Sequence, residues 1–249
     1  MSRVKYMNNS GEQRFYRKIF NSSDLVYFSG KVEQTDLYIG ATRNLSEEAY
    51  KSIVRYRQQV EDYIRRQPVF LSSLSPVKPL PDAPLIVKHM CRAAEIAGVG
   101  PMAAIAGAIS LYVANDLLKY SKELIVENGG DIYIAGTQER TVGIFAGKSR
   151  LSGKLGIKVP PEDLPISICT SSATVGHSLS FGKADAVTIL SKDACIADAA
   201  ATAVGNIVKS AGDIEKALKK ARNISGVIGA LIIIEDRIGA WGKIQMVKL

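Results

Sequence analysis

Short alternating runs of hydrophobic and polar residues open the chain. They lie between Gln13 and Gly40, in the segments RFYRKIF, LVYFSGKV and DLYIG. Alternation with a period of two is typical of β-strands, so residues 1–42 are expected to form an antiparallel meander. After Asn44 the spacing of the hydrophobic residues becomes that of a helix. Asn44 and Glu47, three residues later, form a capping signature for the start of this helix. Pro68 is expected to end this helix.

Prolines and glycines divide the middle of the chain. Residues 68–84 contain five prolines, a composition that predicts an extended connector rather than a packed element. A helix is expected over Leu85–Ala97, because Pro84 suits its first position and Gly98 suits its end. A second helix, from Pro101 to about Lys119, begins with alanine, glycine and isoleucine, so another element can approach its backbone closely.

The carboxyl-terminal half mixes strands and helices. A strand is expected at Thr141–Ala146 and a loop region at Leu151–Pro165, while Cys195–Lys209 is expected to be an alanine-rich helix. A further helix over residues 213–222 begins at an aspartate cap. Two apolar runs, turned at Asp236-Arg237, close the chain.

Composition and charge narrow the class of protein. The elements do not alternate strictly as βαβ, so an α+β fold is predicted, with residues 1–249 forming one compact two-lobed unit whose core spans 85–249. The net charge of +8 is scattered over separate helices, so nucleic-acid binding is a remote alternative to phosphate-bearing small molecules. No apolar stretch reaches the ~18 residues of a membrane span, and the polar N-terminus lacks a signal-peptide core. A cytoplasmic location without membrane contact is expected.

Few cysteines and histidines are available for metal chemistry. Cys91, Cys169 and Cys195 stand at wide spacings, which give neither a disulfide framework nor a zinc pattern. The chain has two histidines, His89 and His177. The sequence therefore excludes a histidine-rich metal site.

A Gly-Gly turn joins two hydrophobic runs in Leu124–Gly136, LIVENGGDIYIAG. Gly129 and Gly130 allow positive φ and leave no Cβ to keep a ligand from the backbone. The amides of such a turn can converge on an anion, and Glu127 and Asp131 are close enough to hold a cation or a ribose hydroxyl. Asn-Gly between apolar runs is also the best short-range signature of an ordinary β-hairpin, and the turn alone favours that structural interpretation.

A second candidate is the hydroxyl-rich segment Cys169–Ser178, CTSSATVGHS. Hydroxyls and free amides together form a cradle for phosphate or sugar, and a polar surface loop explains them equally well. The hydroxyl side chains concerned are Thr170, Ser171, Ser172 and Ser178. A Cys169–His177 nucleophile pair is a catalytic alternative, but the apolar residues before the cysteine favour a buried thiol.

The third candidate is a carboxylate in the alanine-rich helix. Asp198 and Thr202 are four residues apart, so they lie on one helical face, a turn from each other. A carboxylate and a hydroxyl form a partial ligand set for Mg²⁺, which prefers oxygen and keeps several waters. The alternative is that Asp198 caps a helix beginning only at Ala199, although Asp193 already offers a cap upstream.

Two of these segments, together with a glycine loop upstream, resemble the ApbE-type flavin transferases, which use Mg²⁺ to move FMN from FAD onto a protein threonine. Asn128–Asp131 matches the family's Gly-Gly-Asp turn, and Asp198–Ala203 matches its Asp-Ala-x-x-Thr-Ala helix. Gly98–Ala103 stands where the family has its glycine loop. Nearly the whole chain resembles a prokaryotic branch of this superfamily.

The resemblance implies an ApbE-like fold of antiparallel sheets packed with helices, and a metal-assisted nucleotide site. Mg²⁺ would be held by Asp198, Thr202 and the backbone carbonyl of Ala103, and it would neutralise charge on the phosphates. FAD or FMN would lie against the glycine loop, the Gly-Gly turn and the hydroxyl segment. The backbone and side chains concerned are Gly100, Asn128, Gly129, Gly130 and Asp131. If the protein is an enzyme, Asp198 acts through the metal, His177 is the general base, and an acceptor protein is the second substrate.

The chain departs from the transferases at two places. Ala104 stands where they carry a lysine, and His177 is not followed by their Asp-Pro. A protein that binds a flavin or nucleotide without turning it over is therefore the alternative to an FMN transferase. The small-residue faces at 103–108 and 199–203 could form contacts within the chain or between subunits of a homo-oligomer.

Overall fold

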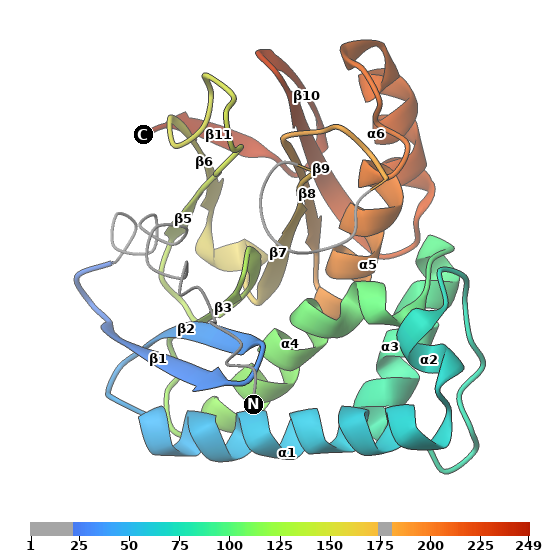
Figure 1. Ribbon diagram of the computed structural model, residues 1–249. Coiled ribbons are helices and arrows are strands. Elements are labelled where there is room, and N and C mark those ends of the chain that lie inside the picture. The colour runs from blue at the N-terminus through green and yellow to red at the C-terminus, as the bar shows by residue number, and fades with distance from the viewer. Residues whose placement is uncertain (1–21, 174–180) are drawn as a thin grey trace, which may run out of the picture.

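An eight-stranded antiparallel sheet lies between a layer of helices and a smaller, three-stranded sheet (Figure 1). The computed structural model describes residues 22–173 and 181–249. The predicted strand RFYRKIF, as well as His177 and Ser178, lies outside these residues. Within them, the predicted α+β class with antiparallel sheets packed against helices is confirmed.

The large sheet has the strand order β1-β2-β3-β4-β7-β8-β9-β10, and its neighbouring strands are antiparallel. Its strands are β1 Val26–Val32, β2 Thr35–Ala41, β3 Leu124–Asn128, β4 Asp131–Ala135, β7 Ile166–Ser171, β8 Ala186–Ser191, β9 Val227–Ile234 and β10 Arg237–Gly242. The hairpins predicted at residues 13–40 and at the Gly-Gly turn correspond to β1–β2 and β3–β4. The last hairpin turns at Glu235-Asp236, one residue earlier than predicted.

The small sheet corrects one prediction. It contains β5 Arg140–Gly143, β6 Leu155–Val159 and β11 Gln245–Lys248, in the order β11-β6-β5. The loop predicted over Leu151–Pro165 is wrong, because β6 pairs its backbone with a strand on each side despite the prolines that follow it. The final apolar run divides after Gly242, whose φ of 79° lets the chain leave the large sheet.

The helices cover the face of the large sheet that is opposite the small sheet (Figure 1). They are α1 Ser46–Arg66, α2 Val69–Ser72, α3 Leu85–Ala97, α4 Ile105–Leu117, α5 Ala194–Gly205 and α6 Ile214–Asn223. A 3₁₀ helix, Pro101–Ala104, precedes α4, so the helix predicted from Pro101 begins with a tighter turn. The predicted connector 68–84 is not wholly extended, because the fully buried Phe70 packs edge-on against Tyr63 and anchors α2.

The predicted helix caps are confirmed in part. Asp193 caps α5, with its Oδ1 accepting the N–H of Cys195 at 2.9 Å. Asn44 does not form the predicted capping box, because its Oδ1 accepts the N–H of Ser46 (2.9 Å) and α1 begins there. Asp213 caps the 3₁₀ helix Ala211–Asp213 together with Ser210 and makes no side-chain cap to α6 itself.

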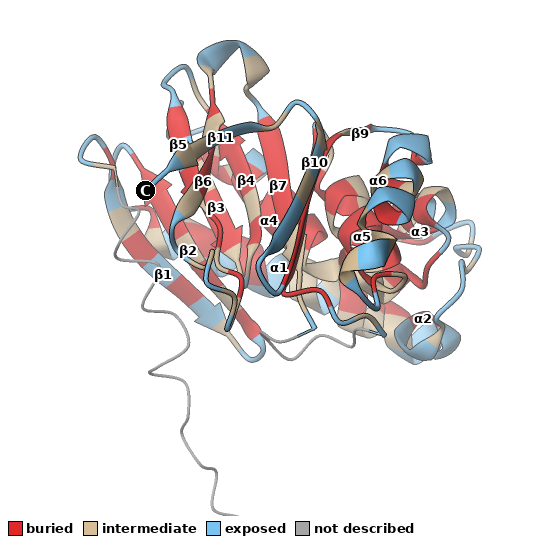
Figure 2. Ribbon diagram, turned by 90° about the horizontal axis from the view of Figure 1, so that it is seen from above, coloured by how far each residue is buried: buried red, intermediate tan, exposed pale blue. Residues whose placement is uncertain are grey.

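Two hydrophobic cores fill the spaces between the three layers, and Figure 2 shows the buried residues along the central strands. Alternate residues of each central strand enter different cores. Tyr133 of β4 and Cys169 of β7 pack toward the helices, whereas Ile134 and Ile168 pack toward the small sheet. Side chains at neighbouring positions of one strand therefore act on opposite faces of the sheet.

Apolar character is concentrated in the inner helices. Within the described ranges, no single helix is long and apolar enough to cross a membrane. Only α3 and the segment Pro101–Leu117, taken together across a bend of 105°, reach that length and composition. Both helices contribute many residues to the larger core.

Candidate functional site

The Gly-Gly turn is a tight β-hairpin between β3 and β4. Asn128 pairs with Asp131 across it, and Gly129 and Gly130 have φ values of 66° and 113°, in the region that favours glycine. The N–H of Gly130 donates to Oε1 of Glu127 (3.1 Å), so this amide is bound within the hairpin. The carbonyl of Gly130 accepts the N–H of Thr170 (3.2 Å), and this hydrogen bond holds the turn against β7.

Two carboxylates meet on the helical side of the sheet. Asp131, the first residue of β4, is buried, and its Oδ1 has no hydrogen-bond partner among the described residues. Asp198 lies in the second turn of α5, and its Oδ2 accepts the N–H of Gly107 on α4 (2.9 Å). The hydroxyl of Ser110 donates to the carbonyls of Ala106 and Asp131 (3.0 Å each). Helix α4 thereby holds the start of β4 beside α5.

Gly107 allows α4 and α5 to lie this close. A Cβ at this position would stand 2.3 Å from the carbonyl oxygen of Ala194 and 2.9 Å from Cβ of Asp198, closer than side-chain atoms pack. The small-residue faces predicted on these two helices therefore contact each other within one chain. Of the two alternatives left open by the sequence, the structure shows the intramolecular contact.

The surroundings of the two carboxylates disfavour their charged forms. Burial raises the pKa of Asp131 well above its usual range, and the charges of Asp198 and Glu127 raise it further. Burial also raises the pKa of Asp198 to about 7, against the lowering effect of hydrogen bonds from the backbone of Gly107 and Ala106. A bound divalent cation would relieve this penalty, because it compensates both negative charges.

The donor atoms of this cluster suit a hard cation. Asp131 and Asp198 offer carboxylate oxygens, and Thr202 stands one turn further along α5. Oxygen ligands of this kind are those that Mg²⁺ prefers, so the residues present fit that ion. The alternative in which Asp198 caps a helix is wrong, because α5 begins at Ala194 under the Asp193 cap.

The predicted glycine loop precedes α4 and packs against α5 through the 3₁₀ helix Pro101–Ala104. Gly100 lies against the proline-rich connector, where a Cβ would stand 1.7 Å from the carbonyl oxygen of Ser73. This close approach is by itself a structural reason for the glycine. Ala103 is half-buried and Ala104 fully buried; the roles of Gly100 and Ala103 toward a ligand stay predictions.

The hydroxyl-rich segment begins as part of the sheet. Thr170 and Ser171 belong to β7, whose backbone pairs with β8. The hydroxyl of Thr170 shares a hydrogen bond with that of Thr188 (2.9 Å). Cys169 is buried as predicted, and burial raises the pKa of its thiol well above the usual range, which makes it a poor nucleophile. Its proposed partner His177 lies outside the described residues.

A cavity of about 210 Å³ lies between the two sheets. Ile132, Ile134 and Ile168 line it, and these residues alternate along β4 and β7 with those that face the helices. Tyr27 and Tyr38 form an aromatic wall, with stacked rings whose centroids are 5.3 Å apart. The cavity is therefore mainly apolar and occupies the face of the large sheet opposite Asp131.

The Gly-Gly turn borders both of these regions. The predicted residues that also line the cavity are Gly129, Gly130, Thr170 and Ser172. Glu127 lines it too, so it faces the opposite side of the sheet from Asp131. The structure thus places an apolar cavity and a pair of carboxylates on the two faces of the sheet, with the turn between them.

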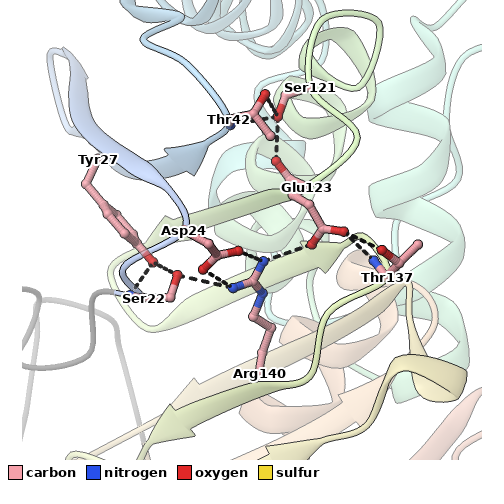
Figure 3. Close-up of polar contacts among 8 residues, drawn as sticks. All are labelled: Ser22, Asp24, Tyr27, Thr42, Ser121, Glu123, Thr137 and Arg140. Carbon is pink, nitrogen blue, oxygen red and sulfur yellow. Dashed lines mark hydrogen bonds and ion pairs between the residues drawn. The ribbon is translucent and has the colours of Figure 1, made fainter.

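Arg140 is a residue of this region that no sequence motif indicates (Figure 3). Its buried guanidinium makes two hydrogen bonds of 2.8 Å to the carboxylate of Asp24 and one of 2.8 Å to Glu123. The hydrogen bond from Arg140 lowers the pKa of Asp24 to about 2. Because Arg140 and Asp24 are 116 residues apart in sequence, no local pattern connects them.

The sequence is similar to that of proteins whose names give no activity. A model of the family described as AbpE bacteria matches residues 17–245. A UPF0280 protein of Methanococcus aeolicus is 44% identical over 219 residues, covering 86% of each chain. A UPF0280 protein of Methanocaldococcus jannaschii is 43% identical over 206 residues, covering 80% of this chain and 84% of the relative.

The fold is similar to that of solved ApbE proteins. The flavin transferase ApbE from Vibrio cholerae superposes with a TM-score of 0.59 at 14% identity, covering 88% of this chain and 97% of the other. The ApbE protein from Thermotoga maritima gives a TM-score of 0.61 at 14% identity, covering 86% and 96%. At this identity the likeness concerns the fold.

Proposed function

This chain belongs to the family described as AbpE bacteria, and from that membership we propose that it binds a flavin dinucleotide such as FAD together with Mg²⁺ beside the Gly-Gly turn. The observation that carries the proposal is the carboxylate pair: Oδ1 of Asp131 is buried without a hydrogen-bond partner among the described residues, beside Asp198. Buried carboxylates without a compensating cation are strongly unfavourable. Mg²⁺ held by Asp131, Asp198 and Thr202 would neutralise phosphate charge.

The cavity between the sheets supports a planar aromatic ring as the other part of the ligand. Its apolar lining and the stacked Tyr27 and Tyr38 favour such a ring. At the turn, a Cβ built on Gly129 has no atom within 4 Å, which leaves the backbone open to a phosphate-bearing chain. A ligand with an aromatic end and an anionic end fits these neighbouring regions together.

Two versions of this function differ in whether chemistry follows binding. The solved structures of similar fold carry the name flavin transferase, which supports transfer of FMN to an acceptor protein, with His177 as the base. The absence of the transferase lysine at Ala104 and of Asp-Pro after His177 supports binding without transfer. We favour binding without transfer. The carboxylate pair and the cavity that support binding are present in this chain, whereas the lysine and the Asp-Pro of the transferases are not.

Titration of FAD with and without Mg²⁺, followed by calorimetry, tests the carboxylate pair. The wild-type protein is expected to bind FAD more tightly with Mg²⁺ than without it. In Asp131→Asn and Asp198→Asn, this increase in FAD affinity is expected to be smaller by a factor of at least about ten. Asparagine keeps the size of the side chain and removes its charge. Asp236→Asn, in the exposed β9–β10 turn, is the control. Equal FAD affinities in all four proteins in the presence of Mg²⁺ would contradict the proposal.

Filling the cavity tests the site of the ring. Ile132→Trp places a larger side chain into the cavity and is expected to weaken FAD binding by about tenfold or more, with Mg²⁺ binding unchanged. Ile238→Trp, on the partly exposed strand β10, is the matched control. Unchanged FAD affinity in a folded Ile132→Trp protein would place the ring elsewhere.

Product analysis separates transfer from binding. The protein is incubated with FAD, Mg²⁺ and a threonine-bearing acceptor, and the supernatant is separated by HPLC. We expect intact FAD and no AMP. AMP released in step with flavin attached to the acceptor, and lost in His177→Gln, would instead identify a transferase.

A further inference from the structure

A second cluster of ligand-type side chains lies where α3 meets the start of α5. Nε2 of His89 stands 2.6 Å from Oδ2 of Asp193, and with Sγ of Cys195 these atoms all lie within 4.8 Å of one another. In the part of the chain that the structure describes, this cluster is the one group of three or more His, Cys, Asp or Glu side chains whose ligand atoms lie this close together. We propose that His89, Asp193 and Cys195 bind Zn²⁺.

The geometry of Asp193 leaves one of its oxygens directed at this cluster. Oδ1 caps α5 by accepting the N–H groups of Cys195 and Ile196 (2.9 and 3.3 Å), and Oδ2 faces His89. The His89 ring packs edge-on against Tyr112, with ring centroids 5.9 Å apart. The cap and the aromatic contact fix the orientation of two ligands before any ion binds, which favours affinity.

The donor set identifies the class of ion. An imidazole nitrogen, a carboxylate oxygen and a thiolate sulfur together suit Zn²⁺, whereas Mg²⁺ takes oxygen ligands. Three protein ligands leave one position of a tetrahedral site for water or another ligand. The side chains of His89 and Asp193 are 25% and 30% exposed, so the ion can reach the buried thiol from solvent. On binding, the thiol releases its proton to water, and the ion replaces the proton that Nε2 of His89 shares with Asp193. That proton moves to water or to Nδ1, so that the imidazole ligates in its neutral form.

A His89–Asp193 ion pair that only joins α3 to α5 is the competing explanation. It accounts for the 2.6 Å contact and the helix cap, but it gives no function to the sulfur beside them. The two explanations differ in what Cys195 does: it ligates in one and only packs in the other. A measurement that detects a metal–sulfur bond therefore separates them.

Cobalt titration of the full-length protein, freed of metal by a chelator, is the test. Co²⁺ is expected to bind at one ion per chain with a thiolate-to-cobalt charge-transfer absorption, and Zn²⁺ to abolish this absorption by displacement. Cys195→Ser should lack the band. His89→Gln, which keeps a hydrogen-bond donor toward Asp193 at a partly exposed position, should weaken Zn²⁺ binding by about a hundredfold. Circular dichroism establishes that each variant is folded.

Matched variants distinguish this site from the others. Cys91→Ala, a buried cysteine on the same helix as His89, should keep the band, and so should Asp198→Asn, which alters the carboxylate pair. The proposal is overturned if the metal-free wild-type protein binds neither ion at micromolar concentration. It is equally overturned if folded Cys195→Ser retains the charge-transfer band, or if folded His89→Gln binds Zn²⁺ as tightly as the wild type.

Discussion

Asp131 and Asp198 show how the surroundings of a residue, rather than its type, determine its chemistry. Both are aspartates in a chain with 24 acidic residues, yet burial raises the pKa of each, that of Asp198 to about 7. Other aspartates behave in the opposite way: a hydrogen bond from Arg140 lowers the pKa of Asp24 to about 2. A carboxyl pKa that is raised by burial and by a neighbouring charge is a marker of candidate functional sites.

The carboxylate pair predicts how stability depends on pH. In the metal-free protein, the folded-state pKa of Asp198 lies above its unfolded value. Its contribution is therefore fully present below the unfolded pKa of about 4 and is lost as the pH rises through about 7. The thermal unfolding midpoint in EDTA is expected to fall over that window and to be restored by Mg²⁺ at the upper end. A folded Asp198→Asn protein with an undiminished pH dependence would refute this assignment.

At the scale of elements, the contact between α4 and α5 positions the pair. Gly107 donates its N–H to Asp198 and leaves room for the carbonyl of Ala194. A glycine inside a helix usually costs about 1 kcal/mol relative to alanine, so this one is retained at the expense of helix stability. Close approach of the two backbones is the physical reason.

Gly107→Ala is accordingly expected to destabilise the protein, against the usual effect of this substitution in helices. The added Cβ would stand 2.3 Å from a backbone oxygen, which cannot turn aside as a flexible side chain can. We expect a loss of about 1–3 kcal/mol in the free energy of unfolding, measured by urea denaturation. Gly212→Ala, whose Cβ would have only Ser210 Oγ nearby at 3.6 Å, should stay within about 0.5 kcal/mol of wild type. A stabilised Gly107→Ala protein would show that the helices move apart freely.

At the scale of the whole molecule, two sheets have to be held together for the cavity between them to exist. Their shared core contains residues of both, such as Ile134 and Ile157. At one end, Arg140 of β5 in the small sheet binds Asp24 and Glu123, which precede β1 and β3 of the large sheet (Figure 3). This buried ion-pair network joins the sheets beside the cavity, which Arg140 also lines.

Replacing Arg140 is therefore expected to loosen the sheets and weaken ligand binding together. Arg140→Met keeps much of the side-chain bulk but leaves Glu123 without its cation, at a cost of about 3 kcal/mol. Chemical denaturation and FAD titration measure the two effects. Arg65→Met removes an exposed pair with Asp62 on α1 and should cost less than about 0.5 kcal/mol. If the two variants have equal stability, the network does not hold the sheets.

Local pattern in the sequence determined the elements that depend on neighbouring residues. The hairpin at Gly129-Gly130, the cap at Asp193 and the burial of Cys169 follow from spacing and residue type, and all three are confirmed. The mixed fold class follows from the same periodicities. Pro160 and Pro161 favoured a loop prediction where β6 lies. The strand forms there because its backbone pairs with two partners distant in sequence, β5 and β11.

Only the tertiary structure decided which distant residues meet. The partners of Arg140, the cavity and the His89–Asp193–Cys195 cluster each join segments far apart in sequence. The family resemblance already implied one site for Asp131 and Asp198, and the structure added the burial that raises their pKa values. Period and composition describe the surroundings of a residue along the chain, and they contain no distance between segments. The physical reason is that sheet pairing and helix packing set those distances, through long-range contacts such as that of Gly107 with Ala194.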